Sequence, residues 1–202
     1  MDLVVDLHPP YQMLHTDSAE KWNSIGLIKI SYNFPPTQRI IPMQDMLVKL
    51  YELPDYSSIE NGLKDQGIII RPALSAEKSI VVDWIRQRFD DGWASEGEVC
   101  FSFEPVRCFI ALKDREILGF ACYDVAYRNF FGPTAVDPHH RNQGIGKVLL
   151  WKSLLAMRSQ GYAYAIIGGV GPAEYYTRVV GAELIKGSNP GIYRGILSHV
   201  PV

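Results

Sequence analysis

The chain has 202 residues, of which 47% are hydrophobic and 21% charged, with a formal net charge of -2. This length and composition favour one globular domain with a sizeable core and exclude the disordered and fibrous classes. The near-zero charge provides no basic footprint, so we expect neither nucleic acid nor a membrane surface as a partner.

The sequence also lacks signals for secretion and for metal binding. No basic region followed by an apolar run opens the chain, and no stretch of about 18 apolar residues occurs, which favours a cytoplasmic protein. The chain has three cysteines, an odd number, and their spacing is longer than that of zinc or redox motifs. We therefore interpret Cys100, Cys108 and Cys122 as core residues in a reducing compartment. The adjacent His139 and His140 are interpreted as loop residues, and no metal site is expected.

The N-terminal part differs from the rest of the chain. Residues 1–45 contain two proline doublets and little periodicity apart from a candidate strand at Ile25–Tyr32, so we expect an irregular extension. The alternative is that Met46 is the physiological start and that the preceding residues come from an upstream start assignment. Residues 46–66 are interpreted as a lead-in segment, and residues 67–202 as the main domain.

The main domain opens with a strand and a helix. Residues 67–72 form a short apolar strand closed by Pro72, and Ser75 stands where a helix N-cap is expected. Apolar residues then recur at helical spacing up to Phe89. Residues 106–127 predict two strands joined by a turn at Lys113–Glu116, and residues 129–136 predict a third strand, so we expect an antiparallel meander.

The second half alternates helices and strands. The pattern predicts a helix over Gly144–Gln160 that ends at Gly161, and then a strand over residues 162–169. A short helix follows, with Pro172 at a first-turn position. Residues 182–197 predict a terminal hairpin that turns at Ser188–Gly191. Together these elements predict a mixed α/β fold.

One loop, between the third meander strand and the long helix, carries anion-binding chemistry. A helix N-terminus leaves backbone N–H groups unpaired and attracts phosphate, and Gly144 and Gly146 would let an anion approach those groups. Arg141 adds a cation with a planar donor fork. The residues around Lys147 do not match a Walker phosphate loop, and the glycines at 168–171 have the wrong spacing for a dinucleotide fingerprint.

Residues Val136–Gly146 fit the pattern V-x-P-x-x-R-x-x-G-x-G. In this respect the sequence resembles the GCN5-related N-acetyltransferases, over about residues 67–197. The resemblance implies an acetyltransferase-like domain with a largely antiparallel sheet, a splayed cofactor-binding strand and flanking helices. It also implies acetyl-CoA as co-substrate, with main-chain contacts to its pantetheine arm from Ala135 and Val136. The residues implied at its pyrophosphate are Arg141, Asn142, Gln143, Gly144, Ile145, Gly146 and Lys147.

A second segment supports this resemblance. The family often carries F-Y-x-K-x-G-F on a later helix, and residues 175–182 here contain Tyr176 at the tyrosine position. This chain has one more residue before Gly181, and Ala182 in place of an aromatic residue. The resemblance implies that Tyr176 donates a proton to the leaving thiolate.

The implied reaction is direct attack of an amine on the thioester in a ternary complex, with an N–H near Val136 stabilising the oxyanion. The base that takes the proton of the amine could be Glu96, Glu98 or Asp124, and the sequence does not decide among them. Each of the three could also be an ordinary loop or turn carboxylate. Trp93 is one of several aromatic residues that could line the acceptor pocket. The amine acceptor is not identified by the sequence.

Two questions of assembly and function stay open at this point. A non-catalytic acyl-CoA-binding regulatory module would carry the same cofactor loop, so it is the alternative to an N-acetyltransferase. A homodimer could form through the terminal hairpin or an exposed sheet edge.

Overall fold

The computed structural model of the chain describes residues 44–197, so the candidate strand at Ile25–Tyr32 lies outside the described residues. The strands are β1 (Met46–Lys49), β2 (Ile69–Pro72), β3 (Cys108–Lys113), β4 (Glu116–Tyr123), β5 (Phe130–Val136), β6 (Tyr164–Ile167) and β7 (Glu183–Leu184). The helices are α1 (Ser57–Asp65), α2 (Lys78–Arg88), α3 (Asp91–Val99), α4 (Ile145–Ser159) and α5 (Ala173–Val180).

The strands form one sheet in the order β2-β3-β4-β5-β6-β1-β7. All neighbours pair antiparallel except β5 and β6, which are parallel. The predicted mixed α/β class is confirmed, as is the β3–β4–β5 meander with its turn at Lys113–Glu116.

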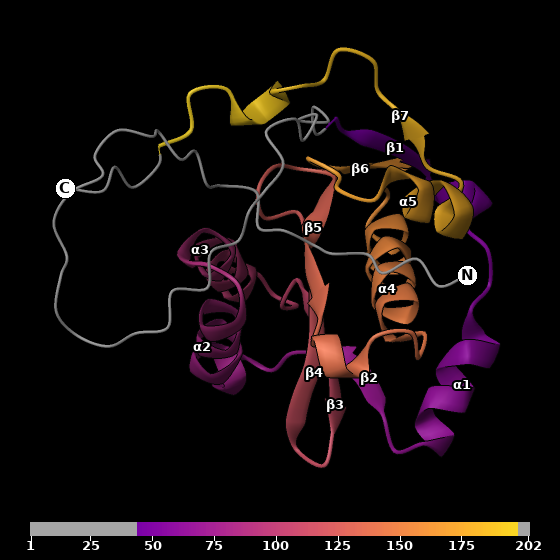
Figure 1. Cartoon of the computed structure of the whole chain (residues 1–202), viewed down its shortest axis with the longest axis vertical. Helices are drawn as coiled ribbons and strands as arrows, with labels where there is room; N and C mark the ends of the chain where they lie inside the picture. Colours follow the sequence, from indigo (N-terminus) through magenta and orange to yellow (C-terminus); the bar gives the residue numbers. More distant parts are fainter. Residues whose placement is uncertain (1–43, 198–202) are drawn as a thin grey trace, which may run out of the picture.

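Helices cover both faces of this sheet (Figure 1). Because side chains alternate along a strand, β4 sends Phe120 to the face packed against α2 and α3, and Ala121 to the face packed against α4. Likewise, Ala135 of β5 faces the α2–α3 layer and Val136 faces the α4 layer. The sheet therefore separates two hydrophobic cores, and β5 contributes to both.

The start of α2 differs from the prediction for Ser75. Ser75 does not cap the helix but begins a 3-10 turn, Ser75–Glu77, that leads into α2. The Glu77 carboxylate accepts hydrogen bonds from the Leu74 N–H (2.7 Å) and from the Arg71 guanidinium (2.6 and 2.8 Å). Since Glu77 satisfies the backbone at this corner, the hydroxyl of Ser75 is not needed as a cap.

The predicted terminal hairpin is wrong. β7 has two residues and pairs with β1, and a 3-10 turn at Gly191–Tyr193 follows instead of a return strand. Asp45 takes up the hydrogen bonds of this segment: its C=O accepts from Ile185 N–H (2.9 Å), and its N–H donates to Ser188 Oγ (2.7 Å). Residues 46–66, interpreted above as a lead-in, thus contribute a strand between β6 and β7 and, in α1, a helix beside α4.

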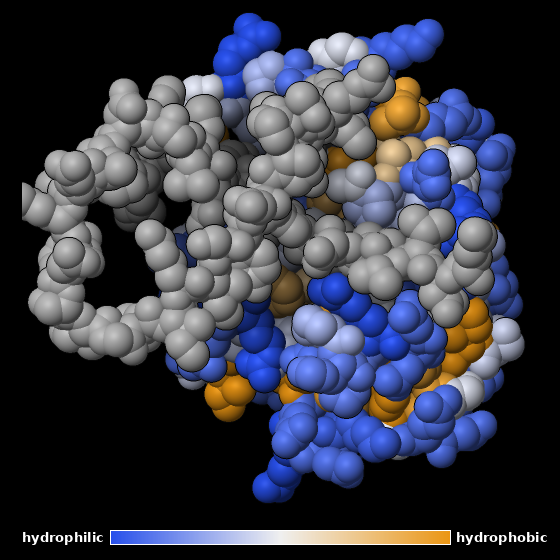
Figure 2. Space-filling model, in the orientation of Figure 1, coloured by the Kyte–Doolittle hydropathy of each residue, from blue (hydrophilic) through white to orange (hydrophobic). Residues whose placement is uncertain are grey.

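Within the described residues, no helix combines the length and the apolar character needed to cross a bilayer. In the view of Figure 2, the described surface is mostly polar, with separate apolar patches and no continuous apolar face.

Candidate functional site

A cleft opens where β5 and β6 separate. The two strands pair only at Phe130–Ile166 and Phe131–Ile167 and then diverge. At the point of divergence Gly132 and Pro133 together oppose the single residue Cys122 on β4, which is a β-bulge, and Gly132 has a φ of +123°. The bulge bends β5 away from its neighbour, and a cavity of about 600 Å³ lies in the gap.

Three parts of the chain line this cavity. One is the α2–α3 corner, one is β5 with the loop that follows it, and one is the segment from the end of β6 into α5. Of the residues predicted from the sequence, Trp93, Ala135, Arg141 and Tyr176 lie on the lining. The lining residues that the sequence did not indicate include Arg88, Asp90, Asp137, Gly168 and Val170.

The end of β5 presents its main chain to the cleft. Asp137 N–H donates to Leu118 C=O (2.8 Å), and Val136 stands opposite Gly119 on β4. Val136 is therefore at a non-hydrogen-bonded position, so its N–H and C=O point away from β4 and toward the side from which β6 has departed. The C=O accepts a hydrogen bond from Arg141 Nε at 3.3 Å, which holds the arginine at the cleft.

The loop before α4 depends on unusual backbone angles. Gly144 is the N-cap of α4 with a φ of +90°, and Asn142 has a φ of +62°. A Cβ on Gly144 would lie 2.8 Å from Ile59 Cγ2 on α1, so this position excludes a side chain. With glycine as N-cap no side chain caps the helix, and its first N–H groups are oriented to meet an anion.

The other loop residues differ in where their side chains point. Ile145 is buried in the α4 core, and the Lys147 ammonium lies 5.1 Å from the centroid of the Tyr56 ring. Asn142 and Gln143 are exposed. Ile145 and Lys147 are therefore placed to offer an anion their main-chain N–H groups.

Gly146 stands at a narrow point between β5 and α5. A Cβ there would lie 3.4 Å from Val136 Cγ2 and 3.7 Å from Tyr175 Oη. The start of α4, the end of β5 and the start of α5 thus meet within van der Waals distance of this residue.

The side chains of two adjacent tyrosines on α5 point to different places. Tyr176 lines the cleft, while Tyr175 approaches Gly146, and their rings meet edge to face with centroids 5.1 Å apart. Burial raises the pKa of Tyr176 far above its usual value and raises that of Tyr175 to about 12. At neutral pH both hydroxyls keep their protons, so Tyr176 is available as a proton donor.

The three candidate base carboxylates have different surroundings, and none of them is on the cavity lining. Glu96 lies half-buried on α3, one turn after Trp93, which does line the cavity. Burial, with a smaller effect from the Asp90 carboxylate, raises the pKa of Glu96 to about 7. Glu98 is exposed and pairs with Lys78 at 2.9 Å, and this partner lowers its pKa.

Asp124 belongs to the turn between β4 and β5. Its Oδ1 accepts a hydrogen bond from Asn129 N–H (2.6 Å), its Oδ2 lies 3.0 Å from Arg107, and its φ is +60°. Oδ1 is hydrogen-bonded within the turn, and the buried Oδ2 makes no hydrogen bond to the described part of the chain but lies within ion-pair distance of Arg107, so the contacts of Asp124 are those of a turn residue.

Two further acidic residues shape the cleft. Asp137 pairs with Arg88 (3.1 Å), whose guanidinium stacks 4.7 Å from the centroid of the Trp84 ring, so α2 is tied to the end of β5. The buried Asp45 accepts a hydrogen bond from Gly169 N–H (2.9 Å) and holds the β6–α5 segment. Asp137 lies inside the motif, between Val136 and Pro138, so the sequence could have indicated it as a cleft residue. Nothing in the sequence connects Asp45 with Gly169.

Comparisons with known proteins agree with this architecture. The model of the "Acetyltransferase (GNAT) family" matches residues 75–178, more than half of the 202-residue chain. No curated protein matches the chain by sequence.

Solved structures show the same fold at low identity. One is a region of a fungal multi-domain GH3 β-N-acetylglucosaminidase described as a GCN5-related glucosamine N-acetyltransferase (TM-score 0.58, 13% identity, 70% of this chain and 19% of that chain). Another is a GCN5-related N-acetyltransferase from Sphaerobacter thermophilus (TM-score 0.55, 16% identity, 71% of this chain and 49% of that chain). The chain thus spans less than half the length of either protein. The family-model match and the splayed β5–β6 cleft lead to one conclusion: this chain belongs to the GNAT acetyltransferase family.

Proposed function

We propose that this protein transfers an acetyl group from acetyl-CoA to a primary amine by direct attack in a ternary complex. The observation that carries the proposal is the meeting of Arg141 and Tyr176 at one cavity beside the outward-facing main chain of Val136. Arg141 follows β5 and Tyr176 lies on α5, so the fold brings a guanidinium group and a phenol hydroxyl to the same cavity. The cavity volume of about 600 Å³ falls in the range of small-ligand sites.

The cofactor would bind along the α4 side of the cleft. The uncapped N–H groups at the start of α4 and the Arg141 guanidinium suit the pyrophosphate, because a helix N-terminus and a planar cation both favour anions. The main-chain groups of β5 that no longer face β6 suit the amides of the pantetheine arm, with Ala135 and Val136 at its sulfur end. In this proposal the loop residues 141–147 act mostly through the backbone.

The chemical step would use one group for each charge that develops. The neutral amine attacks the thioester carbon, the C–S bond breaks, and the acetyl group becomes an amide. The Val136 N–H stabilises the oxyanion, and Tyr176 gives its proton to the departing CoA thiolate. The place of Tyr176 on the cavity lining supports this role, and its hydroxyl keeps its proton at neutral pH.

Of the three candidate bases we favour Glu96, acting on the amine through a water molecule. Its pKa of about 7 is close to the value at which a general base works best near neutrality. Its place one helical turn from Trp93 puts it on the side of α3 that approaches the cleft. Glu98 is bound to Lys78 on the surface, and Asp124 is held by its turn.

The deciding experiment is a calorimetric titration with acetyl-CoA of the wild type, Gly146→Glu and Gly62→Glu. Gly146 is preferable to Gly144 for adding a negative charge, because a Cβ at 146 meets its neighbours at 3.4 Å or more, whereas one at 144 meets Ile59 at 2.8 Å. Gly62, in α1, has no atom within 4 Å of its Cβ position and serves as the matched control.

We expect binding by the wild type and Gly62→Glu, and at least a hundredfold weaker binding by Gly146→Glu with an unchanged circular dichroism spectrum. Turnover over a broad panel of primary amines then separates an enzyme from a regulatory module. Binding without turnover of any amine would favour the module. A folded wild type that binds no acetyl-CoA would refute both.

A further inference from the structure

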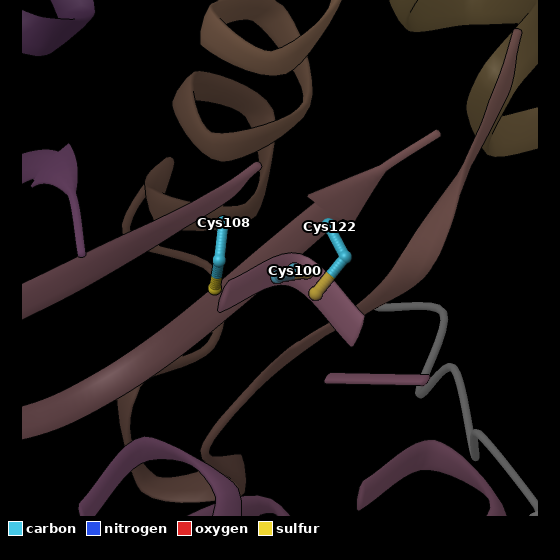
Figure 3. Close-up of side chains that lie close together, drawn as sticks. All are labelled: Cys100, Cys108 and Cys122. Carbon is cyan, nitrogen blue, oxygen red and sulfur yellow. The ribbon is translucent and has the colours of Figure 1, made fainter. Parts of the chain in front are cut away.

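The three cysteines of the chain lie together in the core under the α2–α3 layer (Figure 3). Cys100 begins the 3-10 turn Cys100–Ser102 after α3, Cys108 begins β3, and Cys122 lies on β4. Their three Sγ atoms all lie within 4.8 Å of one another, and all three residues are buried and free of disulfides. The expectation that the three cysteines are core residues is confirmed. Their spacing in the sequence did not predict that the fold brings them together.

The backbone explains why the sulfurs converge. Cys108 stands directly opposite Cys122, and Tyr123 N–H donates to Arg107 C=O (3.2 Å), which makes the two cysteines a non-hydrogen-bonded pair. Side chains at such a pair approach more closely than at a hydrogen-bonded pair. Arg107 N–H in turn donates to Cys100 C=O (3.2 Å), so the third cysteine is tied to the same strand.

The surroundings of this cluster are apolar. The core on this face of the sheet includes Ile85, Ala94 and Phe120. The Cys100 thiol donates a hydrogen bond to Arg107 C=O (3.3 Å) and the Cys108 thiol donates one to Phe109 C=O (3.6 Å). The three sulfurs therefore lie in a core whose described residues offer an ion no ligand atoms other than sulfur and main-chain oxygen.

We propose that Cys100, Cys108 and Cys122 form a trigonal site for one soft, monovalent metal ion such as the cuprous ion. Sulfur ligands about 2.3 Å from a central metal stand about 4 Å apart, so sulfurs within 4.8 Å need to shift by less than an ångström. A ligand set of thiols alone selects soft ions such as Cu(I). Zinc normally takes four ligands in a structural site, and the group found in the described part of the chain has three.

Charge balance also favours a monovalent ion. A cuprous ion bound by one thiolate and two thiols leaves no net charge in an apolar core. Each thiol that ionises on binding releases one proton, so affinity should fall as pH is lowered. No oxidation or reduction is involved, and the proposal is independent of acetyl transfer.

The test is an anaerobic titration of the full-length, reduced protein with Cu(I) against a Cu(I) chelator, followed by X-ray absorption at the copper edge. Because the sulfurs are buried, the ion is added both to native protein and during refolding. We expect one Cu(I) per chain, three sulfur ligands at about 2.3 Å and a higher Tm. Since these are the chain's three cysteines, every Cu–thiolate signal reports on this cluster.

Single Cys→Ser variants should bind Cu(I) at least a hundredfold more weakly. Ala94→Ser is the matched control, because it places a hydroxyl in the same core but keeps the sulfurs, and it should bind as the wild type does. Oxygen or nitrogen ligands at the copper edge of the wild type would overturn the proposal without any variant. So would the lack of stoichiometric binding under both loading conditions, or wild-type affinity in a folded Cys→Ser variant.

Discussion

Two regions that border the cleft present different kinds of chemical group. The loop before α4 offers mainly main-chain N–H groups, and its glycines make room for them. The helices α3 and α5 offer single side chains, chiefly Glu96 and Tyr176. A site made of backbone is damaged by adding atoms, as in Gly146→Glu, whereas a site made of side chains is damaged by deleting one functional group.

The largest expected effect is the deletion of the Tyr176 hydroxyl. Tyr176→Phe should lower kcat by about 100-fold to 10,000-fold, the usual contribution of a general acid, while calorimetry should show unchanged acetyl-CoA affinity. Tyr175→Phe is the matched control, since this neighbouring hydroxyl approaches Gly146 and is not on the cavity lining. Equal losses in both variants would show that the tyrosines act by packing.

The next largest effect is expected from Glu96, the residue proposed to accept the proton of the amine. Glu96→Gln should lower kcat/KM about tenfold to hundredfold near neutrality, and the wild-type rise of kcat/KM through about pH 7 should disappear. Glu98→Gln, on the same helix but exposed and paired with Lys78, should leave the profile unchanged. The base assignment fails if Glu96→Gln keeps the pH dependence of the wild type.

The same carboxyl group should affect stability in a defined direction. Its pKa is raised from 4.5 to about 7, so the folded protein favours the protonated form, and the stability this provides is lost as pH rises through about 7. Glu96→Gln should therefore raise Tm by a few degrees at pH 8 but not at pH 4.5. Calorimetric melting at the two pH values tests this, and a Tm difference of the opposite sign would contradict the burial of Glu96.

A smaller effect on stability is expected where Asp45 holds the segment that leads from β6 into α5. Asp45→Ala removes the acceptor for Gly169 N–H and should reduce the free energy of unfolding by about 1–3 kcal/mol, as measured by urea denaturation. Glu52→Ala, an exposed carboxylate 3.8 Å from Lys49, should change it by less than about 0.5 kcal/mol. If Asp45→Ala leaves the free energy of unfolding unchanged, the buried carboxylate of Asp45 does not hold this segment in place.

The contrast between backbone and side-chain sites also explains what the sequence could predict. The α4 loop and the Lys113–Glu116 turn carry local signals, because glycine, arginine and turn residues act on their immediate neighbours. The sequence therefore predicted where both lie in the fold, while the binding role of the α4 loop stays a prediction. The terminal hairpin was wrong because Asp45, far away in the sequence, supplies the hydrogen bonds that decide the course of residues 185–188. The gathering of the cysteines depends on strand register, which spacing in the sequence does not reveal.

The smallest expected effect tests the backbone side of the comparison most directly. Lys147 lies within the motif, and its charge alone would suggest a phosphate contact, but its ammonium lies against the Tyr56 ring of the α1 side. If the loop works through main-chain N–H groups, Lys147→Met should change acetyl-CoA affinity less than about threefold, because methionine keeps both the N–H and the helix. Arg141→Met, which removes a guanidinium on the cavity lining, should weaken binding about tenfold or more in the same calorimetric titration. Equal losses in the two variants would show that the loop binds by summed positive charge, and the distinction between a backbone site and a side-chain site would not hold on the α4 side.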